Sequence, residues 1–180
     1  DLSVKKNLSI VCFHGKQKIG NGHLIPSGPL RENLMALKNC QTILINGKKD
    51  LEFEQKLKRY NSKLDFFYYD YCLKNIENFK NKKLIAFAGI GNPQNFFDFL
   101  KENHLNIVKE ISYPDHYQYS EKDLENLNKL ENLYKAKLIT TEKDFLRINP
   151  FVRKKFDHIR IELKFENEES FKNKIKQLIK

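Results

Sequence analysis

The sequence predicts an α/β fold in which helices cover both faces of a mostly parallel sheet, an α/β/α layered arrangement of the Rossmann-like kind. Two observations support this prediction. Short apolar segments of strand length alternate along the chain with longer segments whose apolar residues recur at helical spacing. Clusters of Gly, Pro and Asn separate these segments, as turns separate the elements of such a fold.

The expected strands are short and rich in β-branched, aromatic or other apolar residues. Leu84–Ala88 is a continuous apolar run, which is typical of a strand buried on both faces. His158–Phe165 alternates apolar and polar residues, the pattern of a strand with one covered face. In chain order the expected strands are Leu8–Phe13, Thr42–Ile45, Leu64–Cys72, Leu84–Ala88, Asn106–Ile111, Lys137–Thr140 and His158–Phe165.

The expected helices carry apolar residues three or four positions apart. Glu121–Tyr134 repeats leucine at every third position, and Pro93 stands where the first turn of a helix tolerates proline. In chain order the expected helices are Leu30–Lys38, Leu51–Arg59, Gln94–Asn103, Glu121–Tyr134, Thr141–Arg147 and Glu168–Ile179.

Length and composition narrow the possible classes of protein. A chain of 180 residues suffices for one ordinary domain, or for a small domain with part of another. No stretch approaches the roughly 20 apolar residues that cross a bilayer. The chain starts at Asp1 without a signal-peptide pattern, so we expect a segment cut from a longer chain.

The cysteines and the net charge bear on compartment and ligand. Cys12, Cys40 and Cys72 have no metal-ligand spacing, so we expect buried thiols in a reducing cytoplasm and no metal site. The net charge of +10 attracts anions, which leaves open nucleic acid, phosphorylated small molecules or an anionic membrane.

Gly89–Gln94 follows an expected strand and resembles a phosphate-binding loop only superficially. A Walker loop ends in Gly-Lys-Ser/Thr, whereas Asn92-Pro93 follows Gly91 here. No Walker pattern occurs in the 180 residues. The segment is either a tight strand-to-helix turn or a turn that also lines a site.

Pro114–Tyr117 lies in the loop after the next expected strand. Asp115 and His116 offer a carboxylate beside a group that titrates near neutral pH, which suits proton transfer. The alternative is an exposed loop histidine without a catalytic role.

Thr140–Asp144 follows the strand after that. Thr141 is expected to cap a helix whose first turn carries acidic residues. The same helix start could also bind an anion, with Lys143 nearby. The two interpretations are compatible.

Gly20–Glu32 combines flexible glycines and rigid prolines ahead of Arg31-Glu32, which are expected to open a helix. A guanidinium at Arg31 could hold a phosphate by a two-pronged contact. The alternative is a connecting turn that carries an exposed ion pair.

Taken together, these four segments resemble the tetraacyldisaccharide 4'-kinase family. The resemblance covers nearly the whole chain, because the four segments occur in the family's order and spacing. The matching stretches are Gly20-Asn21-Gly22 with Leu24–Glu32, Ala86–Gln94 with Phe96-Phe97, Pro114-Asp115-His116 with Tyr119, and Thr140–Asp144.

The resemblance implies an enzyme that moves the γ-phosphate of ATP, with Mg²⁺, to the 4'-hydroxyl of a tetraacyldisaccharide 1-phosphate in lipid A biosynthesis. It implies two α/β/α domains joined by a two-stranded hinge, of which this chain is the C-terminal portion. Residues 1–75 would end the N-terminal domain, and 76–180 would form the C-terminal one. Leu64–Cys72 and His158–Phe165 are expected to pair as the hinge. The Walker loop and an acidic motif would lie before Asp1, so the fragment alone is expected to be inactive.

The resemblance also implies partners and a location. The partners would be the lipid A disaccharide precursor, the missing N-terminal segment and the membrane surface, with no nucleic acid. The enzyme would be peripheral, on the cytoplasmic side of the bacterial inner membrane.

The resemblance carries roles onto specific residues. His116 would be the catalytic base, with Asp115 shaping its loop or taking part. The other implied roles are substrate binding by Asn21, Arg31, Glu32, Asn92 and Tyr119, and a place near the nucleotide phosphates for Thr141, Glu142, Lys143 and Asp144. Two positions depart from the family pattern, because members often carry Asp where His14 stands and another near Cys40.

A second hypothesis competes with the kinase. The chain could be a basic α/β domain that binds a phosphorylated ligand or nucleic acid without catalysis. It explains the charge and the lack of a Walker loop, but not four ordered motifs.

Overall fold

The computed structural model describes residues 7–178 and divides into two compact units. Unit 1 contains the chain up to Cys72 together with the chain from Leu163 onward, and unit 2 is Leu73–Glu162. The expected boundary at residue 75 lies three residues from the observed one. The residues from Leu163 onward were expected in the second domain, but they group with unit 1.

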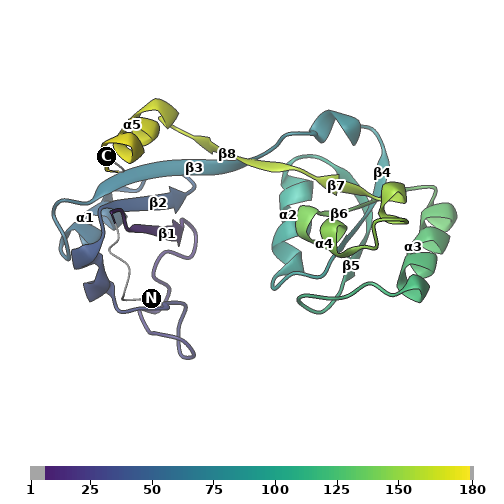
Figure 1. Ribbon diagram of the computed structural model, residues 1–180, viewed down its shortest axis with the longest axis horizontal. Coiled ribbons are helices and arrows are strands. Elements are labelled where there is room, and N and C mark those ends of the chain that lie inside the picture. Colours follow the sequence, from purple (N-terminus) through teal and green to yellow (C-terminus); the bar gives the residue numbers. More distant parts are fainter. Residues whose placement is uncertain (1–6, 179–180) are drawn as a thin grey trace. The chain divides into compact units, whose positions relative to one another are not determined.

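Unit 1 is built on a sheet in the order β1-β2-β3-β8 (Figure 1). Strands β1, β2 and β3 are parallel, as predicted. The elements of this unit are β1 (Ile10–His14), η1 (Leu34–Asn39), β2 (Thr42–Asn46), α1 (Leu51–Lys58) and α5 (Glu168–Leu178), with β3 (Asp65–Leu73) and β8 (Ile161–Phe165), whose ends cross the boundary to unit 2.

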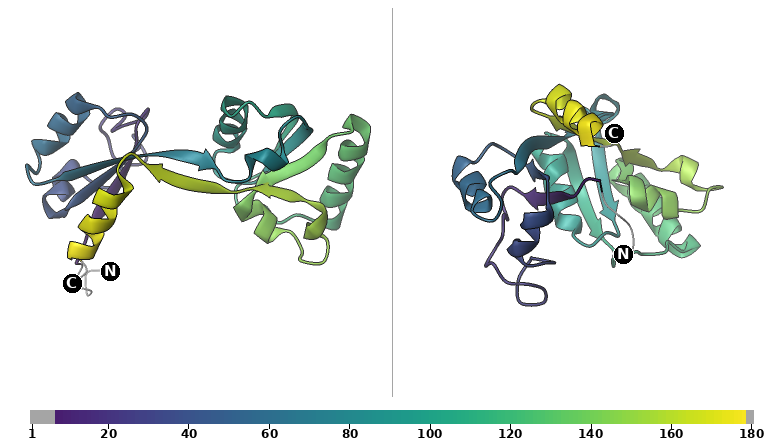
Figure 2. Two further views of the ribbon diagram at one scale, coloured as in Figure 1. Left: turned by 90° about the horizontal axis from the view of Figure 1, so that it is seen from above. Right: turned by 60° about the vertical axis from the view of Figure 1, so that its left-hand side comes forward.

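Helices α1 and α5 lie on opposite faces of this sheet (Figure 2). Phe53 and Leu57 of α1 belong to the cluster that contains Tyr68 of β3. Phe171 of α5 packs on the neighbouring residue Phe67, with ring centroids 5.1 Å apart. Because neighbouring residues of a strand point to opposite faces, the two helices cover both. This packing explains why the C-terminal residues belong to unit 1.

The helix expected at Leu30–Lys38 was placed too early. The structure has a short 3₁₀ helix that starts at Leu34, because the Asn33 side-chain oxygen accepts a hydrogen bond from the Met35 amide at 2.8 Å. Arg31 therefore lies in the preceding loop and does not open a helix.

Unit 2 is built on a fully parallel sheet in the order β5-β4-β6-β7, with α2 and α3 on opposite sides of it (Figure 1). Its elements are η2 (Ile76–Asn78), β4 (Lys83–Ala88), α2 (Pro93–Glu102), β5 (Asn106–Ser112), α3 (Glu121–Tyr134), β6 (Lys137–Thr141), α4 (Glu142–Arg147), η3 (Arg153–Lys155) and β7 (Asp157–Ile159).

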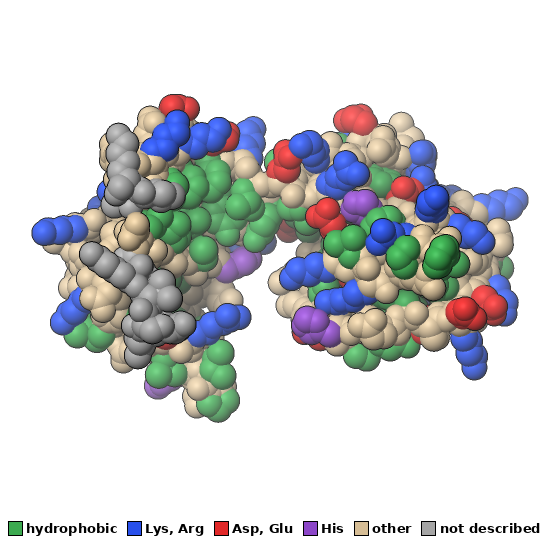
Figure 3. Space-filling view, viewed as in Figure 1, with side chains coloured by type: hydrophobic (Ala, Val, Ile, Leu, Met, Phe, Trp, Pro, Cys, Tyr) green, Lys and Arg blue, Asp and Glu red, His purple; other side chains and the backbone are tan. Residues whose placement is uncertain are grey.

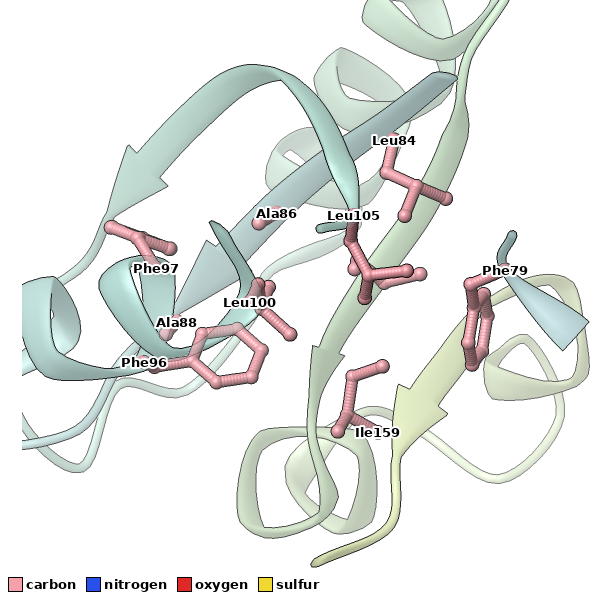
Figure 4. Packing of buried hydrophobic residues seen from close by; sticks show 10 residues of the cluster. Phe79, Leu84, Ala86, Ala88, Phe96, Phe97, Leu100, Leu105 and Ile159 are labelled. Carbon is pink, nitrogen blue, oxygen red and sulfur yellow. The ribbon is translucent and has the colours of Figure 1, made fainter. Parts of the chain in front are cut away.

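Alternate residues of the central strand β4 enter two separate cores. Ala86 and Ala88 belong to the cluster that includes Phe97 of α2, and their small side chains leave room for the phenyl rings of that helix (Figure 4). Ile85 and Phe87 belong to the cluster that includes the leucines of α3. The sheet is therefore covered on both faces, which confirms the predicted layered α/β fold.

The strand expected at His158–Phe165 is in fact two strands. β7 ends at Ile159 and β8 begins at Ile161. The Asn75 side chain interrupts them: it donates to the His158 carbonyl at 2.9 Å and accepts from the Arg160 amide at 3.0 Å. β8 does pair with β3, as predicted. Their role as a hinge remains a prediction.

Basic side chains are distributed over both units (Figure 3). The cysteines differ from the expectation of three buried thiols, because Cys40 is buried but Cys12 is exposed and Cys72 half-buried. None of the helices between residues 7 and 178 has the length and apolar character needed to span a membrane.

Candidate active site

Three of the four predicted motifs meet at one edge of the unit 2 sheet. Gly89 follows β4, the loop 113–120 follows β5, and Thr141 ends β6. Parallel neighbours end at the same edge, so these segments converge. The chain runs from β4 to β5 on one side and then crosses to β6 on the other, which makes this edge a topological switch point. Ligands of open α/β sheets bind at such points.

Asp144 lies at the centre of this edge and is fully buried. Its Oδ2 accepts hydrogen bonds from the Gly89 amide at 3.1 Å and from the Thr141 hydroxyl at 2.7 Å. Its Oδ1 accepts from Arg147 Nη1 at 3.1 Å. A buried carboxylate is tolerated when it is paired and hydrogen-bonded in this way.

The predicted helix cap at Thr141 is confirmed. Its hydroxyl oxygen accepts from the Asp144 amide at 3.1 Å while the hydroxyl donates back to the Asp144 carboxylate. The two hydrogen bonds hold Thr141 and Asp144 together at the start of α4. On β6, the neighbouring Thr140 hydroxyl donates to the Phe87 carbonyl of β4 at 2.6 Å.

The neighbouring loops approach Gly89 so closely that they leave no room for a side chain. A Cβ atom at this position would lie 3.0 Å from Tyr117 Cβ and 3.1 Å from the Pro114 carbonyl oxygen. The predicted turn at Gly89–Gln94 is also confirmed: Asn92 caps α2 by accepting from the Asn95 amide at 3.3 Å, and Pro93 occupies the first turn. Nothing in these contacts tests a role for Asn92 in substrate binding.

Hydrogen bonds of its backbone amide hold His116 in place, and its side chain is 81% exposed. It adopts a left-handed conformation with φ of 59°. Its amide donates to the Gly89 carbonyl at 3.1 Å and to Asp115 Oδ1 at 2.9 Å. Asp115 therefore shapes the loop, and its other oxygen lies 3.8 Å from His116 Nε2.

Arg147 joins these groups and was missed by the sequence analysis. Its Nη1 donates to the Gly89 carbonyl at 2.8 Å and to Asp144 Oδ1, and its Nη2 lies 3.1 Å from His116 Nδ1. The sequence does offer one signal, because an arginine three residues after an aspartate lies on the same side of a helix.

Tyr119 anchors the loop in an aromatic cluster. Its ring centroid lies 5.6 Å from that of Phe87 and 5.1 Å from that of Tyr113. The Tyr119 hydroxyl is buried, and no acceptor in the described part of the chain meets hydrogen-bond geometry with it. Burial raises the pKa of Tyr119, and the neighbouring Asp144 carboxylate raises it further. These contacts make Tyr119 a support of the loop, and its predicted role in substrate binding stays a prediction.

Glu142 and Lys143 lie in the first turn of α4 and are exposed. Within residues 7–178, neither side chain forms a hydrogen bond or an ion pair. They are near the network in sequence, but the structure does not bring them into it.

The remaining predicted residues lie in unit 1, in the loop between β1 and η1. The Asn21 side chain braces this loop by donating to the Ser27 carbonyl at 2.8 Å and accepting from the His23 amide at 3.1 Å. Arg31 and Glu32 are exposed, and among the described residues neither forms an ion pair or a side-chain hydrogen bond. The alternative of an Arg31–Glu32 ion pair is therefore not supported.

The two positions that depart from the family pattern differ in environment. His14 is exposed at the end of β1. Cys40 is buried, and its thiol donates to the Ser9 and Thr42 carbonyls, both at 3.2 Å. Cys40 therefore has a structural role.

Comparison with known proteins identifies relatives over the whole chain. The family model described as tetraacyldisaccharide-1-P 4'-kinase matches residues 1–180. A tetraacyldisaccharide 4'-kinase of Pelagibacter ubique is 37% identical over 99% of this chain and 58% of its own length. One of Rickettsia bellii is 40% identical over 79% of this chain and 44% of its own length.

A solved structure supports the fold. The crystal structure of an LpxK protein from Aquifex aeolicus, in complex with ATP, matches 97% of this chain and 53% of its own with a TM-score of 0.61. Its sequence identity is 22%, so the likeness concerns the fold alone. The chain spans about half the length of the relatives it matches.

Proposed function

The chain belongs to the tetraacyldisaccharide-1-P 4'-kinase family, and on that premise we propose that it forms part of an ATP-dependent kinase of lipid A biosynthesis. The substrate would be a tetraacyldisaccharide 1-phosphate, phosphorylated on its 4'-hydroxyl. The relatives are named for this activity. The competing hypothesis of a binding domain without catalysis offers no reason for the arrangement around His116.

One observation supports a catalytic role above the others. The motifs at Gly89, His116 and Thr141 are connected by hydrogen bonds at the switch point of the unit 2 sheet, and the His116 side chain is exposed there. A buried, rigid support beneath one exposed imidazole is what a proton-transfer group needs.

In this proposal His116 accepts the proton of the sugar hydroxyl as that hydroxyl attacks the γ-phosphate. An imidazole with one unprotonated ring nitrogen has the lone pair this step requires. Asp115 keeps the loop in shape through its contact with the His116 amide. Arg31 and Glu32, with Asn21 bracing their loop, would contact the disaccharide or its phosphate.

ATP and Mg²⁺ enter the proposal through the family. Between residues 7 and 178 the structure has no group of three or more His, Cys, Asp and Glu side chains placed to hold a metal ion. We therefore assign Mg²⁺ no ligand among them. The 180 residues also contain no Gly-x-x-x-x-Gly-Lys-Ser/Thr sequence for the ATP phosphates, so we propose that they do not transfer phosphate unaided.

Phosphate transfer to the disaccharide tests the proposal. The 180-residue chain should give no product above a heat-killed control, since positioning by a phosphate loop dominates this chemistry. Joined to the part of the Pelagibacter ubique relative that lies outside the match, it should phosphorylate the 4'-hydroxyl. Turnover by the chain alone would refute the need for further residues. A folded, joined protein that binds ATP but makes no product would favour the binding-domain hypothesis.

We also propose that unit 2 contacts an anionic membrane surface. Leu146 and Phe151 are 63% and 91% exposed, and hydrophobic side chains stand among Lys and Arg on the face that carries α4 (Figure 3). Three basic residues begin two positions after Phe151: Arg153, Lys154 and Lys155. Exposed apolar groups flanked by basic ones suit a peripheral contact with anionic lipid.

Vesicle sedimentation tests this contact. The chain should sediment with vesicles that contain phosphatidylglycerol and much less with neutral ones. Phe151→Ser should weaken sedimentation several-fold, whereas Leu133→Ser, at a leucine of α3 that is 75% exposed, should not. Equal effects of the two substitutions would contradict a specific role for the Phe151 segment.

A further inference from the structure

The hydrogen bond between Arg147 and His116 can have only one direction. Arg147 Nη2 lies 3.1 Å from His116 Nδ1. A guanidinium carries five N–H donors, has no acceptor and stays charged in proteins. The imidazole nitrogen must therefore be the acceptor, and Nδ1 carries no proton.

The other terminal nitrogen of the guanidinium, Nη1, is held by groups other than His116. Nη1 donates to the Gly89 carbonyl at 2.8 Å and to Oδ1 of the buried Asp144 at 3.1 Å. The Asp144 carboxylate is itself fixed by the Gly89 amide and the Thr141 hydroxyl. Because the guanidinium is planar, anchoring Nη1 also fixes the direction of Nη2.

The backbone of His116 is held by contacts of its own. Its amide donates to the same Gly89 carbonyl that accepts from Arg147. The ring is therefore placed by the hydrogen bond from Arg147, with Asp115 Oδ2 3.8 Å from its other nitrogen, and the backbone is placed by separate contacts. Loss of Arg147 Nη2 should release the ring without moving the loop.

We propose that Arg147 is a positioning residue that fixes the tautomer and orientation of the His116 imidazole. A neutral imidazole with an unprotonated Nδ1 carries its proton on Nε2. While the contact lasts, the only ring lone pair is directed at Arg147, and the exposed part of the ring presents an N–H donor. His116 can accept a proton only when this contact opens. The inference concerns the residue to which the proposed function gives proton transfer, but it rests on contacts that exist without substrate.

The test is nitrogen-15 NMR of the histidine rings in the 180-residue chain, without ATP or disaccharide. We expect His116 to show a single Nε2–H tautomer with a hydrogen-bonded Nδ1. His104 provides an internal reference, because it is exposed and has the same φ of 59°. In Arg147→Met, His116 should become a mixture of tautomers like His104, while its backbone amide keeps its hydrogen bond to Gly89 and stays slow to exchange with water.

Arg153→Met is the matched control. Arg153 lies over the Phe145 ring, with its guanidinium carbon 5.6 Å from the ring centroid, and has no described contact with His116. Its substitution should leave the His116 ring signals unchanged. A change equal to that of Arg147→Met would mean a general disturbance and would overturn the proposal.

Arg147→Met also removes the cation of the buried Asp144. A second variant therefore tests the same contact from the His116 side and leaves that ion pair intact. His116→Ala should keep the fold and make the Arg147 Nη2 protons exchange faster with water. A His116 ring with its proton on Nδ1, or Arg147 protons unaffected by His116→Ala, would overturn the proposal. Neither result depends on kinase activity, so failure here is distinct from failure of the proposed function.

Discussion

Two arginines of this chain differ in what their guanidinium groups contact. Arg147 of unit 2 is 17% exposed by its side chain, and three of its contacts are to the Gly89 carbonyl, Asp144 and His116. Arg31 of unit 1 is exposed and, among the described residues, has no side-chain partner. The donors of Arg147 are occupied by the protein, whereas those of Arg31 are available to a ligand.

The segments around the two arginines differ in the same way. The loops of unit 2 are tied to one buried carboxylate and to the ends of three strands. The unit 1 loop is braced by its own residues, chiefly through Asn21, and Gly28 lets the chain pack closely, since a Cβ there would lie 2.2 Å from Asn21 Oδ1. Unit 2 therefore holds a rigid platform, and unit 1 presents a shaped loop with an exposed cation.

The largest expected effect is on the stability of the unit 2 platform. Asp144→Ala removes the acceptor of the Gly89 amide, the Thr141 hydroxyl and Arg147, and leaves a mostly buried cation unpaired. We expect unfolding free energy to fall by about 3 kcal/mol, the usual cost of breaking a buried ion pair. Urea denaturation of the 180-residue chain measures this.

Glu125→Ala on the exposed side of α3 is the control, and it should change stability by less than about 0.5 kcal/mol. If Asp144→Ala were equally mild, the network would not be the support of the site, and the contrast between the two units would disappear.

The next effect is on catalysis by the joined kinase. His116→Ala should lower kcat by about a hundredfold, or roughly 2.7 kcal/mol, with little change in KM for the disaccharide. His104→Ala, at an exposed histidine of the same backbone conformation, should leave both constants unchanged. A rise in KM with kcat intact would instead make His116 a substrate-binding residue.

The smallest effect concerns the available cation of unit 1. Arg31→Ala should lower kcat/KM of the joined kinase by about tenfold, or roughly 1.4 kcal/mol, and leave the urea midpoint of the chain unchanged. Arg59→Ala, at another exposed arginine of the same unit, should alter neither. If Arg31→Ala lowered stability without altering kinetics, Arg31 would be a support like Arg147.

The sequence by itself determined most of the local structure. The run Leu84–Ala88, the leucine repeat of Glu121–Tyr134 and the cap at Thr141 all formed as predicted, because each depends on residues a few positions apart. The layered α/β class followed from their alternation. The motifs also identified the family that the comparisons found.

The tertiary structure decided what depends on residues far apart in the chain. Arg147 meets His116 across 31 positions, and Asp144 meets Gly89 across 55. Asn75 interrupts the last strand from 85 positions away, at Arg160. Helical spacing relates Asp144 to Arg147, but no periodic pattern predicts which loop their free hydrogen-bonding groups will reach. Only the order of the strands, which brings the ends of β5, β4 and β6 to one edge, made a single network of three separate motifs.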